Sequence, residues 1–162
     1  MILKISQTHL NKAIQIFQTM SLEAKQSLSD EVAHEQPHLL GSILVLPQMS
    51  VSMENTQFAL EGLLIIYLAL RQSGKKLPVI TEDDLSNSMD CLLGEIKFIQ
   101  DLPEALQDQS LLQSHAIKKE PILAAFVLAH LGHEVVSGDG PEQDKYMVLS
   151  LMNIVRSIAV SK

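Results

Sequence analysis

The sequence has few of the residues that folds other than helical bundles require. It contains no tryptophan, and aromatic residues make up only 4% of its 162 positions. Glycine and proline occur seven and six times, too rarely for the many turns of a strand-rich domain. Hydrophobic residues make up 46% and charged residues 19%, which suits a packed aliphatic core and not a disordered chain. We therefore expect an all-α fold, in which aliphatic side chains interdigitate between helices.

Basic residues are in the minority. The chain has 12 lysines and arginines against 19 aspartates and glutamates, a formal net charge of −7 at neutral pH. The two basic pairs, Lys75-Lys76 and Lys118-Lys119, are isolated and have no aromatic neighbours. A chain with this charge repels polyanions, so we expect no nucleic-acid binding.

Cysteine and long apolar runs are nearly absent. Cys91 is the only cysteine, so no internal disulfide can form and nothing points to an oxidising compartment. The first residues lack the basic and apolar regions of a secretory signal. The most apolar run, Phe58–Leu70, is interrupted by Glu61 and is far shorter than the ~20 residues of a membrane span. We expect a cytoplasmic protein without membrane insertion.

Helical periodicity runs through the whole chain. Apolar residues recur at three- and four-residue spacing, and Ser, Thr, Pro and Gly stand where helices would begin or end. The pattern predicts a single all-α domain over residues 1–162, a bundle of about 7–8 helices. We expect one helix to end and the next to begin at Gln36–Pro37 and again at Glu120–Pro121. The expected helices cover about residues 7–19, 22–36, 37–46, 52–73, 81–101, 103–119, 121–131 and 141–159.

The helical pattern occurs twice. Offsets of 82, 84 and 88 residues align Leu10 with Leu92, Pro37 with Pro121 and Phe58 with Tyr146. The order of the helices and the matching prolines indicate an internal duplication into two pseudo-symmetric four-helix halves, about 1–78 and 79–162. A chance match is the alternative, because any two amphipathic helices align at some offset and the drifting offset requires short insertions.

The sharpest motif is His34-Glu35-Gln36-Pro37-His38, which matches the H-E-x-x-H pattern of zinc metalloproteases. In that pattern a continuous helix places both histidines on one face, with the glutamate beside them as general base. Pro37 disfavours helical geometry at Gln36, and a straight helix here would cost ~3 kcal/mol or more. We expect the helix to break between the histidines, which makes the motif an accidental match. A metal site at His34, Glu35 and His38 is the alternative interpretation.

Three other reactive side chains have structural interpretations. Cys91 lies close to the apolar stripe of a predicted helix, so we expect a half-buried, structural thiol. His130 and His133 lie at the end of another predicted helix, where an imidazole can cap the free carbonyls of that helix.

The amount of apolar surface indicates that the chain associates with a partner. The helices after Ser52 and Pro141 are apolar on most of their circumference, and a domain of this size buries only ~70% of its unfolded surface. An apolar face left uncovered usually marks an interface, and two-fold assemblies are the commonest, so we expect a homodimer or a docked partner. Met49 and Met53 are expected to fill the core, although exposed methionines would suit an adaptable partner surface.

These observations favour a non-catalytic helical protein that binds another protein, or itself, through an apolar face. Whether the chain is an enzyme stays open. The first alternative is a metal-dependent enzyme or metal-binding protein centred on His34, Glu35 and His38, with zinc as its metal. The second alternative is a protein that binds a small apolar ligand between its two halves. No cofactor is expected outside the zinc alternative.

Overall fold

The computed structural model of the chain describes residues 5–101, 103, 119–131 and 144–161. In these ranges 83% of the residues are helical and there is no strand, so the predicted all-α fold is confirmed. No helix of the described part is long and apolar enough to cross a membrane. The helices are α1 (Gln7–Thr19), α2 (Leu22–Glu35), α3 (Pro37–Leu44), α4 (Met53–Ser73), α5 (Glu82–Gln100), α8 (Pro121–Leu131) and α10 (Asp144–Val160), with a 3₁₀ turn, η1 (Leu46–Met49), between α3 and α4. The helix predicted over about 103–119 lies outside the described residues.

Most helix ends follow the capping residues of the sequence. The hydroxyls of Ser21 and Ser52 accept hydrogen bonds from backbone N–H groups in the first turns of α2 and α4. Gly74 ends α4 in the left-handed conformation, with φ 73°, which glycine adopts without steric cost. One end differs from the prediction: α3 stops at Leu44 because Pro47, which cannot donate to an α-helical hydrogen bond, belongs to the following 3₁₀ turn.

Both predicted proline breaks are confirmed. α2 ends at Glu35, and α3 begins at Pro37. Gln36 between them has φ −137° and ψ 63°, outside the helical region. At the second site, α8 begins at Pro121. Each proline occupies the first helical position, where its missing N–H removes no helical hydrogen bond.

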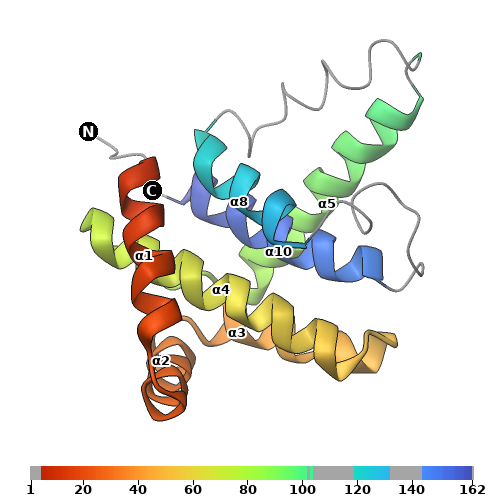
Figure 1. Cartoon of the computed structure of the whole chain (residues 1–162). Coiled ribbons are helices and arrows are strands. Elements are labelled where there is room, and N and C mark those ends of the chain that lie inside the picture. Colours follow the sequence, from red (N-terminus) through yellow and green to blue (C-terminus); the bar gives the residue numbers. More distant parts are fainter. Residues whose placement is uncertain (1–4, 102, 104–118, 132–143, 162) are drawn as a thin grey trace.

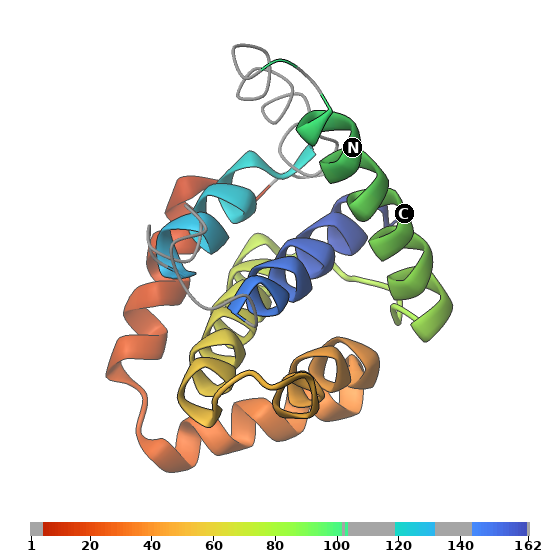
Figure 2. The same cartoon turned by 90° about the vertical axis from the view of Figure 1, so that its right-hand side faces the viewer.

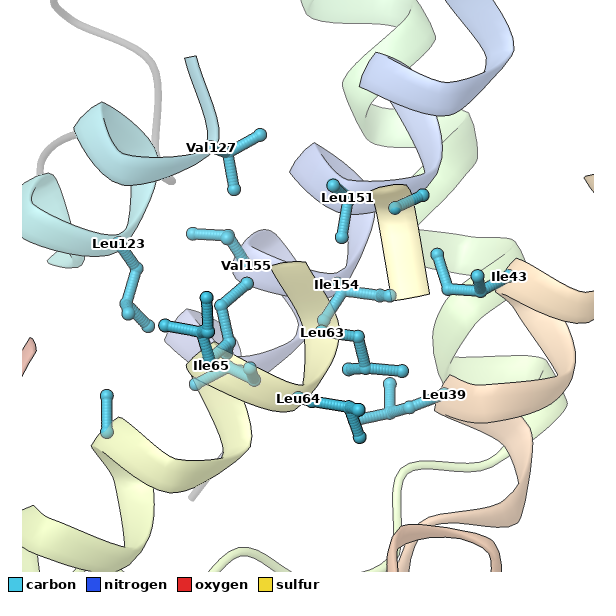
Figure 3. Close-up of a cluster of buried hydrophobic side chains, with 14 of the residues drawn as sticks. Leu39, Ile43, Leu63, Leu64, Ile65, Leu123, Val127, Leu151, Ile154 and Val155 are labelled. Atoms are coloured by element: carbon cyan, nitrogen blue, oxygen red, sulfur yellow. The ribbon is translucent and has the colours of Figure 1, made fainter. Parts of the chain in front are cut away.

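Helices α4 and α10 form the centre of the bundle (Figure 1). α4 packs against α1, α2, α3, α8 and α10, which explains why it is apolar on nearly all sides. α1 lies on one side of the central pair and α5 on the other (Figure 2). Figure 3 shows the aliphatic side chains between the central helices, namely Leu39 and Ile43 of α3, Leu63, Leu64 and Ile65 of α4, Leu123 and Val127 of α8, and Leu151, Ile154 and Val155 of α10.

The packing pattern is the same for both parts of the chain. α1 packs on α4 and α8, and correspondingly α5 packs on α10 and α3. α3 packs on α4 and α10, and correspondingly α8 packs on α10 and α4. Exchanging α1 with α5, α3 with α8, and α4 with α10 therefore leaves the contacts among these six helices in place.

Two buried polar side chains make equivalent hydrogen bonds in this arrangement. Gln36 and Glu120, which directly precede Pro37 and Pro121, are 3% and 2% exposed. The Oε1 atom of Gln36 accepts a hydrogen bond from the N–H of Ile80, at 3.0 Å. The Oε2 atom of Glu120 accepts one from the N–H of Ile5, at 3.3 Å. Ile80 and Ile5 each lie two residues before a helix, α5 and α1 respectively, so each part of the chain anchors the start of the other.

The helix caps identify corresponding residues in α1 and α5. Ser6 and His9 exchange reciprocal side chain-to-backbone hydrogen bonds at the start of α1. Thr81 and Asp84 do the same at the start of α5. Aligning these two boxes gives an offset of 75 residues, where periodicity had suggested 82. The two offsets differ by about two helical turns and present the same face, so periodicity could not separate them.

Candidate functional site

The H-E-x-x-H segment is split between two helices. His34 and Glu35 lie in the last turn of α2 and are exposed, and His38 is the second residue of α3. Gln36, between them, is buried and bonds the 78–80 segment through both ends of its amide. The central residue of the motif therefore has a structural role.

His38 and Glu35 of this segment have separate surroundings. The Nδ1 atom of His38 lies 3.7 Å from Glu82 Oε1 at the start of α5, whereas Glu35 faces Tyr67 of α4, 3.3 Å from its hydroxyl. No group of three or more His, Cys, Asp or Glu side chains in the described ranges is arranged to hold a metal ion. A site built from His34, Glu35 and His38 would require the chain to rearrange around Pro37.

A pocket of about 530 Å³ lies beside this segment, and its lining includes charged residues that pair with one another. Glu31 of α2 forms an ion pair with Arg71 of α4. The hydroxyl of Tyr67 is 3.2 Å from Glu31 Oε1 and 3.3 Å from Glu35 Oε2, so its one proton serves either carboxylate. This cluster joins α2 to α4.

The electrostatics of this cluster agree with its geometry. The hydrogen bond from Arg71 is the main cause that lowers the pKa of Glu31 below its usual value. Burial raises the pKa of Tyr67 to about 12, and the charges of Glu31 and Glu35 add to the effect. The phenol therefore stays protonated and donates a hydrogen bond at neutral pH. The arrangement suits a structural role, in which the cluster holds α2 against α4.

A second pocket, about 510 Å³, lies between α5 and α10. Its lining residues include Arg156, Ser88 and Ser157. Arg156 Nη1 is 3.5 Å from Ser88 Oγ, and its Nη2 is 3.6 Å from Glu95 Oε1. These are long contacts that hold the guanidinium loosely.

All the buried side-chain atoms that lack a hydrogen-bond partner in the described residues belong to this α5–α10 interface. They are Glu95 Oε2, Asn153 Oδ1, Arg156 Nε and Ser157 Oγ. A buried polar atom without a partner costs about 1–3 kcal/mol, and native proteins contain few of them. Their concentration at one interface marks it as different from the rest of the bundle.

Two expectations for single residues are wrong. Cys91 is exposed, not half-buried, and lines the α5–α10 pocket. His130 bonds another helix instead of capping its own: its Nε2 is 2.8 Å from the carbonyl oxygen of Phe58 in α4, and its ring stacks on the Phe58 ring at 4.4 Å. His133 lies outside the described residues. Both outcomes depend on contacts between distant segments, which local sequence does not contain.

The exposed apolar surface lies only in part where it was expected. The middle of α4 is buried, so most of its apolar surface is covered within the chain. Phe58 of α4 and Tyr146 of α10 are nevertheless exposed, at 42% and 40%. A further group of large apolar side chains is exposed at the corner between α3 and α4. This apolar corner consists of Leu44, Val45, Met49 and Met53. The expectation that both of its methionines fill the core is therefore wrong.

No protein-family model, no curated protein and no solved structure matches the chain.

Proposed function

We propose that the chain is a non-catalytic helical protein that associates with a second copy of itself through the apolar corner. The observation that supports this proposal is the exposure of Leu44 and Met53, at 55% and 72%. The four side chains of the corner lie within ten residues of one another and close to one turn of the chain. Isolated exposed apolar residues are normal on monomers, but a group of them favours an interface.

Charge favours a second copy as the occupant. The chain has a net charge of −7, so two copies repel each other over most of their surfaces. Residues 39–53 contain no charged side chain, which makes this corner a place where two copies can meet without like-charge repulsion. The flexible side chains of Met49 and Met53 can adapt to an identical partner across a two-fold axis.

The equivalent packing of the two parts of the chain supports the duplication as well. We infer that residues of about 1–78 and 79–162 descend from one repeated unit. The reciprocal hydrogen bonds of Gln36 and Glu120 favour this origin over a chance match, because periodicity alone does not produce them.

Sedimentation equilibrium over a wide concentration range tests the dimer. The variant Leu44→Glu/Met53→Glu should weaken self-association by at least about 100-fold, because like charges brought together at an interface cost several kcal/mol. Leu22→Glu is the matched control: Leu22 is 82% exposed but lies on α2, outside the corner. The control should dimerise like the wild-type chain. A wild-type chain that is monomeric at every concentration rejects the proposal, and so does a control that dissociates as strongly as the corner variant.

A further inference from the structure

Helix α5 is joined to the core of the bundle near its start. Of its residues up to Lys97, Leu85 is the one that belongs to the continuous hydrophobic cluster. Leu92 is buried outside that cluster, and Met89 and Ile96 are half-buried without packing against it. The equivalent helix α1 differs, because its apolar residues all belong to the cluster or pack against it, namely Leu10, Ala13, Ile14, Ile16 and Phe17. The part of α5 after Leu85 therefore adds little to the core.

α10 presents a polar face to α5, at the edge of the bundle (Figure 1). The side chain of Asn153 donates a hydrogen bond to the carbonyl oxygen of Leu85, at 3.0 Å. Further along α5 come the two long contacts of Arg156, 3.5 Å from Ser88 and 3.6 Å from Glu95. The buried apolar residues of α10 belong instead to the central core (Figure 3). A firm hydrogen bond thus holds the start of α5, and weak contacts hold the rest.

The four buried atoms without a hydrogen-bond partner make this interface costly while it is closed. They belong to Glu95, Asn153, Arg156 and Ser157. Water can bond all four once α5 moves away, which removes the cost of leaving them unpaired. The movement uncovers little apolar surface, so the hydrophobic effect opposes it only weakly. α1 has neither property, because it packs on α4 through apolar residues.

We propose that α5 is a hinged arm, whose part after Leu85 opens from α10 while the other described helices stay packed. The pivot is Leu85, since the core holds its side chain and Asn153 holds its carbonyl oxygen. The chain before it is fixed as well, because the N–H of Ile80 donates to the buried Gln36. Elements with few buried apolar contacts open in this way without global unfolding. The arm controls access to the polar face of α10, and it is independent of the proposed dimer, whose apolar corner contains no residue of α5.

Native-state hydrogen exchange at increasing urea concentration tests the arm. The detached part of α5 is a short helix that is only marginally stable alone in water, so the amides of residues 89–97 exchange when the arm opens. After correction for intrinsic rates, they should exchange at least about tenfold faster than the slowest amides of α1, α4 and α10. Their exchange should also depend weakly on urea, because the opening exposes little surface. Exchange at the same rate and with the same urea dependence as in α1 overturns the proposal.

A variant that carries the residues of the first half tests the cause of the opening. The offsets of 75 and 88 residues pair four polar residues of the interface with Ala13, Met20, Leu68 and Ala69. The variant is therefore Ser88→Ala/Glu95→Met/Arg156→Leu/Ser157→Ala. It should slow exchange in residues 89–97 at least about tenfold relative to α1, because fewer buried polar atoms gain water on opening. If the arm exchanges as fast relative to α1 as in the wild-type chain, the unpaired atoms do not drive the opening and the proposal is overturned.

Two further variants keep the test decisive. Ser157→Ala alone removes one unpaired hydroxyl without adding volume, so it serves if the quadruple variant does not fold, and it should slow the arm by about fivefold. Lys97→Met is the matched control, since it replaces a charged, exposed residue of α5 by methionine outside the interface. It should leave the exchange of the arm unchanged. A control that slows the arm as much as Ser157→Ala overturns the assignment to the interface.

Discussion

Lys75 and Glu120 form an ion pair in the interior of the bundle, with Nζ and Oε1 3.8 Å apart and with side chains 12% and 2% exposed. Lys75 lies two residues after the end of α4, and Glu120 directly precedes α8, so the pair joins the end of one half to the middle of the other. Gln36 occupies the corresponding place before α3, and it does so without a charge. The amide of Gln36 bonds Pro78 O and Ile80 N–H. The residue before the proline thus makes neutral hydrogen bonds in one half, through Gln36, and an ion pair in the other, through Glu120.

Neutralising one partner of the Lys75–Glu120 ion pair should destabilise the fold. Glu120→Gln retains an acceptor for Ile5 N–H but leaves the Lys75 ammonium without this counter-charge, at an expected cost of about 3 kcal/mol. Combining it with Lys75→Met should restore most of the loss, because a neutral pair needs no desolvation of charge. Chemical denaturation of the two single variants and the double variant measures the coupling. Additive losses in the double variant would show that the two side chains act independently.

Removing the hydrogen bonds of the Gln36 amide should also lower the free energy of unfolding. Gln36→Leu keeps the volume of the side chain but leaves the buried N–H of Ile80 unpaired, which should lower the free energy of unfolding by about 2 kcal/mol. Gln57→Leu, at an exposed position of α4, is the control and should change stability by less than about 0.5 kcal/mol. Equal effects of the two substitutions would argue against a structural role for the Gln36 amide.

The sequence predicted the ends of helices better than it predicted the contacts between them. Pro37, Pro121 and Gly74 act on their own backbone, so their effects could be predicted from the sequence alone. The α5–α10 pocket could not be predicted, because Arg156 and Ser88 are 68 residues apart and meet only in the folded chain. Exposure at the apolar corner was missed for the same reason: burial depends on which neighbour covers a residue, and periodicity does not specify that neighbour.

The Tyr67 hydroxyl should lose its proton at a higher pH than an ordinary tyrosine. Its pKa is raised from 10.0 to about 12 in the folded chain. The folded state therefore holds the proton more tightly than the unfolded state, so this contribution to stability is present below about pH 10 and is lost as the pH rises through about 12. Near-ultraviolet absorbance of the phenolate measures the titration in a Tyr146→Phe variant, where Tyr67 is the only tyrosine. A midpoint close to 10 in the folded protein contradicts the Glu31–Tyr67–Glu35 arrangement.

Glu31 should contribute to the dependence of stability on pH in the acidic range. Its folded pKa lies below the usual value of 4.5, chiefly because Arg71 donates a hydrogen bond to it. The stability that it provides is present above the unfolded pKa and falls as the pH drops through the folded one. Glu31→Gln should flatten this part of the stability curve, by a small amount because the ion pair is partly exposed. Asp30→Asn, which removes an exposed neighbouring carboxylate, should leave the curve as it is.

The broken H-E-x-x-H segment should show no zinc affinity of its own. Gln36 and Pro37 separate the exposed His34 from His38, which faces Glu82. We expect His34→Ala to leave the zinc content of untagged protein and its melting temperature unchanged within error. Atomic emission of the purified chain measures the metal content. Stoichiometric zinc that is lost in this variant would restore the metal-site alternative.

Glycine substitutions should separate local backbone effects from packing. Gly94, in the middle of α5, has open space where a Cβ would lie, so Gly94→Ala should stabilise the fold by about 0.5–1 kcal/mol through helix propensity. Gly74 also has open space, but its φ of +73° is strained for alanine, so Gly74→Ala should destabilise by about 1 kcal/mol. At Gly62 a Cβ would lie 3.2 Å from side-chain atoms of His130 and Leu151.

Gly62 therefore reports on how closely α4 approaches α8 and α10. Gly62→Ala gains helix propensity but forces both neighbours to move by a few tenths of an ångström, so we expect a smaller gain than at Gly94, or none. Gly62→Val should cost about 1–3 kcal/mol, because the extra methyl groups overpack a closely packed crossing. Thermal and urea unfolding of the four variants should give the order Gly94→Ala, Gly62→Ala, Gly74→Ala, Gly62→Val, from most to least stable. A Gly62→Val variant as stable as Gly94→Ala would mean that α4 and α8 are not in contact at this position.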